Sequence, residues 1–184
     1  MSESVTKNLR DGTIRILDGS TPPKVCEVVC DDGNLKFTIT GPQAKEILDR
    51  GVLSHLRPGD EVPLDWSFGV KFRDFISQRA GTVSPYEVLL HVGAADAWVS
   101  TNDDGGGVFT LDLEFLIATP TDGERGQAVV IRKCYNIKSE FAEAGENDTL
   151  AFSGKAFVTA PDIQAFIGSP TPELVTATPR ATPD

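Results

Sequence analysis

The sequence predicts a mainly β protein: a β-sandwich or partial barrel with one or two short flanking α-helices. Long stretches alternate apolar and polar residues with a period of two, which is typical of strands with one buried face. Asp-Gly pairs and glycine-rich turns separate these stretches. Two short segments, 41–59 and 84–93, have helical spacing instead.

The N-terminal part predicts three short strands. Residues 13–17 lie between Asp-Gly turn signals, and residues 24–30 are rich in β-branched side chains. Asp32 and Gly33 then lead into alternating residues 35–39, so we expect 24–30 and 35–39 to form a hairpin. Segment 41–59 places apolar residues at helical spacing after Pro42, which predicts an amphipathic helix.

The most informative segment is 61–73, where the alternation is unbroken. The apolar positions are Val62, Leu64, Trp66, Phe68, Val70 and Phe72. Thirteen residues at about 3.3 Å each predict a strand of roughly 35 to 40 Å, longer than most globular strands. Such a strand indicates an extended assembly.

The second half predicts a helix and three more strands. Ser84, Pro85 and Glu87 form a capping-box pattern for a helix that we expect to end near Gly93. After a flexible loop at 102–107, residues 109–117 alternate again, with acidic residues on the polar side. Strands at 127–137 and 149–158 bring the predicted total to seven. We predict one β domain at 1–167 and an extended Pro/Thr-rich arm at 168–184.

Composition excludes several classes of function. The formal net charge of −10 disfavours tight nucleic-acid binding, although an acidic wall would let a polyanion slide past. No stretch approaches the roughly 20 apolar residues of a membrane span, and residues 1–10 lack a signal-peptide core, so we expect a soluble protein with no membrane partner. Three cysteines without a CxxC pair favour burial over metal or disulfide.

The chain contains none of the common catalytic motifs, and we expect no enzyme, cofactor or metal site. His55 and His91 fall at the ends of predicted helices, where they would meet the helix dipole. Asp112 and Glu114 share one strand side that we expect to be solvated. Trp66 and Trp98 predict core or interface anchors, although a small-ligand or carbohydrate-binding β module, which would use them as binding aromatics, is an alternative.

Five segments, taken in order, resemble the tail tube (major tail) proteins of siphophages. They are DGTIRILDGST at 11–21, DDGNLKFT at 31–38, WVST at 98–101, VFTLDLEF at 108–115 and EFAEAGENDTLAFSG at 140–154. The resemblance implies a tail-tube-like fold, six copies closing into a ring, and rings stacking into a tube through which DNA passes. It implies location in the virion tail, and in the host cytoplasm during assembly. The implied partners are further copies of the chain and other tail proteins (terminator, tape measure, distal tail).

This resemblance and the two-faced strands suggest candidate residues. We expect Asp65, Asp112 and Glu114 to line the lumen, with Lys71 and Arg73 moderating a bore that is acidic in part. Loops 74–83 and 99–107 are candidates for contacts between rings, in particular Asn102, Asp103 and Asp104. Another virion component of the same fold, such as a tail terminator, neck or distal tail protein, is an alternative, and a terminator would stop at one ring.

Overall fold

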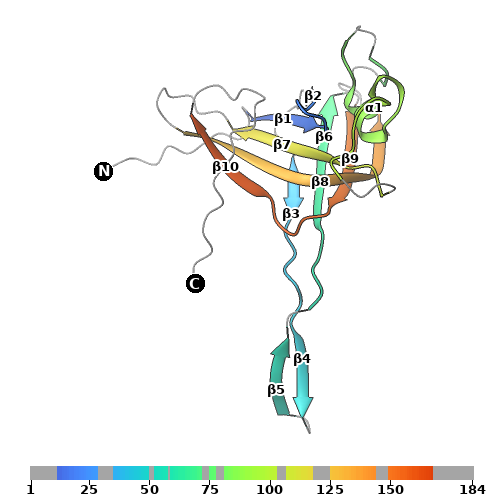
Figure 1. Ribbon diagram of the computed structural model, residues 1–184. Coiled ribbons are helices and arrows are strands. Elements are labelled where there is room, and N and C mark those ends of the chain that lie inside the picture. Colours follow the sequence, from blue (N-terminus) through green and yellow to red (C-terminus); the bar gives the residue numbers. More distant parts are fainter. Residues whose placement is uncertain are drawn as a thin grey trace.

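The computed structural model describes residues 12–28, 35–49, 52–57, 59–71, 75–77, 81–102, 107–117, 125–143 and 149–167. Its elements are mainly strands, as the sequence predicts (Figure 1). In chain order these are β1 (Gly12–Leu17), β2 (Val25–Val28), β3 (Lys36–Thr38), β4 (Lys45–Asp49), β5 (Val52–Arg57), β6 (Leu64–Lys71), α1 (Pro85–Leu90), the 3₁₀ turn η2 (Gly93–Ala95), β7 (Leu111–Ile117), β8 (Arg125–Ala142), β9 (Thr149–Ala156) and β10 (Asp162–Ile167). The predicted boundary between a domain and an arm at 167/168 lies at the edge of these residues and stays a prediction.

One antiparallel sheet of eight strands, in the order β2-β1-β7-β8-β9-β6-β3 with β10 beside β8, forms the body. The long strand β8 belongs to both halves of this sheet. Its first part pairs with β7 and β10, and its second part, from Cys134 to Ala142, pairs with β9. Lys133 between them has φ of 52°, a left-handed conformation that turns the strand. In Figure 1, β1, β7 and β10 accordingly run crosswise to β3 and β6.

The two halves of the sheet enclose a single main core. Strands from both ends of the sheet order contribute to it, including Ile14 and Ile16 of β1 and Leu64 and Trp66 of β6. The burial of β6 alternates strictly, which confirms the two-faced pattern in the sequence over the eight residues of this strand. The predicted strand at 61–73 is nevertheless longer than the observed β6, because residues 61–63 are not paired and residues 72–73 lie outside the described part.

The predicted helix at 84–93 is confirmed, with a full capping box. Ser84 Oγ accepts from the N–H of Glu87 at 3.1 Å, and the Glu87 carboxylate accepts from the N–H of Ser84 at 2.9 Å. The helix ends slightly earlier than expected, at the left-handed C-cap His91. Together with Ala95 and Trp98, α1 contributes Val88 and Leu89 to the core. Among the described residues, no helix is long and apolar enough to cross a membrane.

The predicted amphipathic helix at 41–59 is wrong. This segment instead forms β4 and β5, a two-stranded antiparallel hairpin that projects from the body (Figure 1). Residues 41–48 are all exposed, so no core is present against which a helical apolar face could pack. The apolar spacing of this segment also fits two short strands, because a short apolar run does not distinguish a helix from a strand.

Strand pairing also differs from prediction. The expected hairpin of 24–30 with 35–39 does not form, because β2 pairs with β1 and β3 pairs with β6. The strands expected at 127–137 and 149–158 are β8, which is longer than predicted, and β9. Strand β10 (Asp162–Ile167) was not predicted from the sequence.

Candidate functional site

The most distinctive surface of the body is the outward side of the four strands β3, β6, β9 and β8. Along β6 and β9, every second side chain faces the core and the others face outward. The pairing register aligns the outward positions across the strands, for example Ser67 with both Lys36 and Ser153. We call this surface the polar face; its residues are Lys36, Thr38, Asp65, Ser67, Gly69, Lys71, Tyr135, Lys138, Glu140, Ala142, Thr149, Ala151, Ser153 and Lys155.

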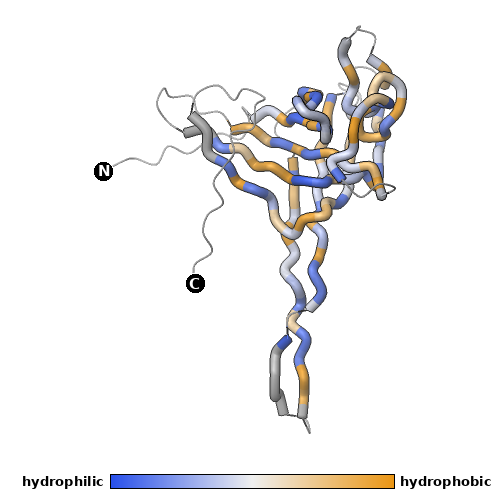
Figure 2. Tube along the Cα trace, in the orientation of Figure 1, coloured by the Kyte–Doolittle hydropathy of each residue, from blue (hydrophilic) through white to orange (hydrophobic). Residues whose placement is uncertain are grey.

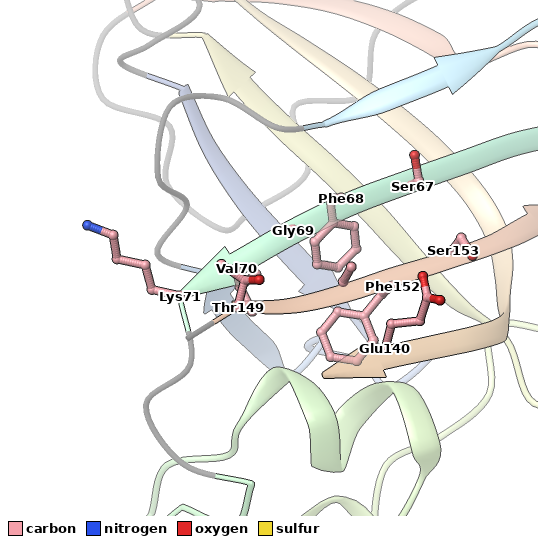
Figure 3. Close-up of a pocket in the computed structure, with 10 residues that line it drawn as sticks. Ser67, Phe68, Gly69, Val70, Lys71, Glu140, Thr149, Phe152 and Ser153 are labelled. Carbon is pink, nitrogen blue, oxygen red and sulfur yellow. The ribbon is translucent and has the colours of Figure 1, made fainter. Parts of the chain in front are cut away.

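Small residues form the middle of the polar face. Ser67, Gly69, Ala151 and Ser153 lie side by side in the register of β6 and β9. They line two shallow hollows, one toward Lys71 and Glu140 and one toward Lys36 and Lys155. Figure 3 shows the first hollow: Phe68 and Phe152 point from the strands toward the helix, whereas Ser67 and Ser153 point to the other side. The face is therefore hollowed and hydrophilic.

A buried aromatic layer fixes the polar face from beneath. The rings of Trp66 and Phe68 stack at 5.7 Å, and Phe68 lies 5.6 Å from Phe152. The indole N–H of Trp66 donates to the carbonyl of Lys155 at 3.0 Å, so this buried donor is satisfied within the sheet. A Cβ at Gly154 would collide with the backbone carbonyl of Tyr135 and also with the indole ring of Trp66. These contacts hold β6 and β9 rigidly side by side.

The charges at the margins of the polar face are mostly positive. Four lysines (Lys36, Lys71, Lys138, Lys155) stand against two carboxylates (Asp65, Glu140). Asp65 lies directly opposite Lys155, and Lys138 forms an ion pair with Glu140. Of the three acidic residues proposed for a lumen, only Asp65 lies on this face.

Asp112 and Glu114 lie elsewhere, on β7 in the other half of the sheet. Between β7 and β6 the sheet order places β8 and β9, so the structure does not bring these residues together with Asp65. Asp112 accepts from the backbone N–H of Lys133 at 2.9 Å and pairs with Arg132 at 3.3 Å, which also binds Asp162 at 2.8 Å. Asp112 therefore clamps the bend of β8 and the start of β10.

Burial raises the pKa of Asp112, although the Lys133 N–H and Arg132 oppose this effect. Burial likewise raises the pKa of Glu114, with Arg15 acting in the opposite direction. The side chain of Asp112 is only 18% exposed. The expectation that both residues form a freely solvated acidic face is therefore wrong, because Asp112 is taken up by the clamp and Glu114 is half-buried.

The other residues singled out in the sequence are the loop residues 102–104 and the two histidines. Asn102 donates its N–H to Ser100 Oγ at 3.2 Å, and Asp103 and Asp104 lie outside the described residues. The imidazole of His91 stacks on Phe109 at 3.9 Å, and His55 belongs to strand β5 and not to a helix end. No group of three or more potential metal ligands occurs in the described ranges.

Both tryptophans are buried, as expected for core anchors. Trp66 is 2% exposed and Trp98 is 7% exposed. A carbohydrate-binding module stacks its aromatic rings on an exposed sugar, so these two rings are not available for that purpose. This observation removes the basis of the ligand-binding alternative in the sequence.

The β4–β5 hairpin is the second distinctive feature of the molecule. Each of its strands pairs only with the other in the described part of the chain. Leu48 is 60% exposed and Ile47 is 37% exposed, and Figure 2 shows hydrophobic positions on β4 far from the body. At the base, Lys45 pairs with Asp60 at 3.2 Å, and Gly59 lies against the backbone of Gln43.

The fold and these two features define a class: an antiparallel β protein with a hollowed polar sheet face and a projecting hairpin. No protein-family model and no curated protein matches the chain. Among solved structures, the chain is similar to one in the 6-fold symmetrised cryo-EM structure of the anti-feeding prophage (AFP) baseplate. The TM-score is 0.48 at 6% sequence identity, and the match covers 91% of this chain and 97% of that chain.

Proposed function

We propose that this chain is a structural virion protein of a phage tail, which self-assembles into hexameric rings that stack into a tube for DNA delivery. The proposal assigns it no catalytic role and no cofactor. Its partners are further copies of itself and neighbouring tail proteins such as the terminator, tape measure and distal tail proteins. The ordered sequence resemblance over residues 11–158 supports this function, and the projecting hairpin carries it.

The hairpin supports self-assembly because, within the described part of the chain, its two strands pair only with each other. A lone two-stranded hairpin is at best marginally stable in water, and three strands or a packed face are normally needed. Here β4 and β5 lie away from the body with Leu48 exposed. A second copy of the chain would supply the missing packing. Such a contact joins different surfaces of two copies, and contacts of this kind generate rings or filaments.

The open edges of the sheet support ring closure. Among the described residues, the strand partner of β3 is β6 alone, at one side of the polar face, and the strand partner of residues 135–140 of β8 is β9 alone, at the other side. Strands at the edge of a sheet readily recruit other strands. In a ring, β3 of one copy would lie beside β8 of the next, and the sheets would close into one barrel. The polar face, including Asp65, would then line the bore.

Negative-stain electron microscopy of the purified protein tests the proposal. We expect hollow tubes at high concentration. Replacing residues 45–57 by a short Gly-Ser linker should leave a folded protein that forms no tubes. A finer variant, I47S/L48S, should weaken stacking, whereas the matched control Ile163→Ser removes an exposed apolar side chain outside the hairpin and should not.

Two outcomes would contradict the proposal. A wild-type protein that stays monomeric at high concentration would exclude a tube subunit. Rings that never stack, even with the hairpin intact, would instead favour a terminator, neck or distal tail protein.

A further inference from the structure

The polar face differs in charge from the rest of the molecule. The whole chain has 17 basic and 27 acidic side chains and a formal net charge of −10. The polar face has four lysines and two carboxylates among the described residues, so these residues carry a net charge of +2. Because local charge governs contact with a partner more than net charge does, an acidic chain with one cationic face directs a polyanion to that face.

From this charge pattern we infer that the polar face makes direct, sequence-independent contacts with the phosphate backbone of double-stranded DNA. The inference rests on the proposed function and reverses one expectation from the sequence, that of a bore acidic in part. DNA in the tube would be held weakly by lysine ammonium groups, and would not simply slide along a wall of like charge.

The arrangement of the lysines fits a backbone and not a base sequence. Lys36 and Lys155 border one hollow, and Lys71 borders the other, with small residues between them. Phosphate contacts position nucleic acid without reading its sequence, and base readout requires side chains that enter a groove. The side chains of the four small residues in the middle of the face are too short to reach base edges, but they leave room for a sugar-phosphate backbone to approach; these residues are Ser67, Gly69, Ala151 and Ser153.

The composition of the face favours nucleic acid over an acidic protein. Protein interfaces depend on large buried anchors, mainly Trp, Tyr and Arg, in a partly apolar centre. The polar face contains no Trp and no Arg, and its one Tyr, Tyr135, lies on β8 opposite Lys155 and contacts Phe157 with ring centroids 5.2 Å apart. Exposed Ile137 of β8 lines the hollow toward Lys36 and Lys155. The large side chains are therefore confined to the β8 side, and the centre of the face, on β6 and β9, is small and polar.

Salt dependence of DNA binding provides the test. Binding of a fluorescent duplex to the unassembled chain would be measured by anisotropy over a range of low salt concentrations, where screening is weak. Each lysine–phosphate contact contributes about 0.9 to the slope of log K against log salt. We expect the K36Q/K155Q variant to lower this slope by about 2. The control Lys45→Gln removes an exposed lysine of the hairpin and should leave the slope unchanged.

The outcomes separate this inference from the proposed function. Wild-type tubes without duplex binding by the unassembled chain would overturn the inference and leave the tube intact. Duplex binding without tube formation would support the contact and refute the tube. Tighter binding of poly-glutamate than of duplex would overturn the inference in favour of an acidic protein partner. A circular dichroism spectrum identical to wild type confirms that each variant is folded.

Discussion

Glu87 is a carboxylate buried completely inside the protein, and its replacement tests how the α1 end of the molecule is held. It accepts three backbone N–H bonds: from Ser77 at 3.1 Å, from Ser84 at 2.9 Å and from Ala94 at 3.2 Å. These donors come from three separate segments, so one side chain joins the loop after β6, the start of α1 and the turn η2. The carboxylate is therefore the local organiser of this end.

The variant Glu87→Gln should destabilise the fold by about 2 to 4 kcal/mol. An amide oxygen can replace Oε2, which serves Ser77 and Ser84, but the NH₂ group then faces the N–H of Ala94. The change weakens charge-assisted bonds worth about 1.5 to 3 kcal/mol and leaves a buried donor unsatisfied at a cost of about 1 to 3 kcal/mol. For a chain of this size, each kcal/mol lowers Tm by about 2 to 4 °C.

The pH dependence provides an independent check. Burial alone raises the pKa of Glu87, but the N–H bonds from Ser84, Ser77 and Ala94 outweigh it, so the folded pKa lies below the ordinary value of 4.5. A group whose folded pKa is lowered contributes stability above its unfolded pKa and loses it as the pH falls toward the folded value. The wild type should therefore lose this stability below about pH 4.5, and Glu87→Gln should lack that part of the acid sensitivity.

Urea unfolding of the unassembled chain at pH 7 and at several lower values measures both effects. The control Glu61→Gln removes an exposed carboxylate that precedes β6, and it should change stability by less than about 0.5 kcal/mol. A Glu87→Gln variant as stable as wild type at pH 7, or with the same acid response, would refute the role of this carboxylate.

Two glycine substitutions test the sheet and the hairpin. Gly154→Ala should destabilise the fold by about 2 kcal/mol or more in thermal melts, because a Cβ would collide with the backbone carbonyl of Tyr135 and with the Trp66 ring. Gly41→Ala, where a Cβ meets nothing within 4 Å, is the control, and equal melting of the two variants would contradict the packing. Gly59→Ala should spread the base of the hairpin, because a Cβ at this position would collide with the backbone of Gln43. This variant should form fewer tubes in electron micrographs, and its Tm should fall by no more than about 2 °C. Normal tubes from this variant would show that the hairpin base need not stay closed.

The local features of the fold could be predicted from sequence, and the long-range ones could not. The capping box at Ser84 and the alternation in β6 depend on residues close in the chain, and both are confirmed. The turn residues around β2 are compatible with pairing to β1 or to β3, and they do not decide between the two. In the structure β2 pairs with β1, and β3 pairs with β6. The short strand β10 was missed because its pairing with β8 joins residues 32 to 42 positions apart, from Asp162 with Val130 to Ile167 with Arg125, beyond any local signal.

The candidate site shows the same division. Alternation placed Asp65 on the polar side of its strand, and the structure confirms that position. It could not show that β7 lies in the other half of the sheet, and therefore that Asp112 and Glu114 are separated from Asp65. The lysines of β3, β8 and β9 come from distant segments, and only the register between strands reveals that they share a face with Lys71.

The hairpin and the polar face are parts of one continuous element. β3 leads through residues 39–44 into β4, and β5 returns through residues 58–63 into β6, while β3 and β6 are paired neighbours within the polar face. A hairpin seated against a second copy would therefore also fix the orientation of these two strands. In the proposed tube, the hairpin contact that holds one ring to the next also fixes the positions of Lys36, Asp65 and Lys71 in the bore. Ring stacking would therefore affect how the bore contacts DNA. The linker variant that lacks the hairpin should accordingly keep its affinity for a DNA duplex while it loses the tube, and a loss of both would show that the hairpin also shapes the polar face.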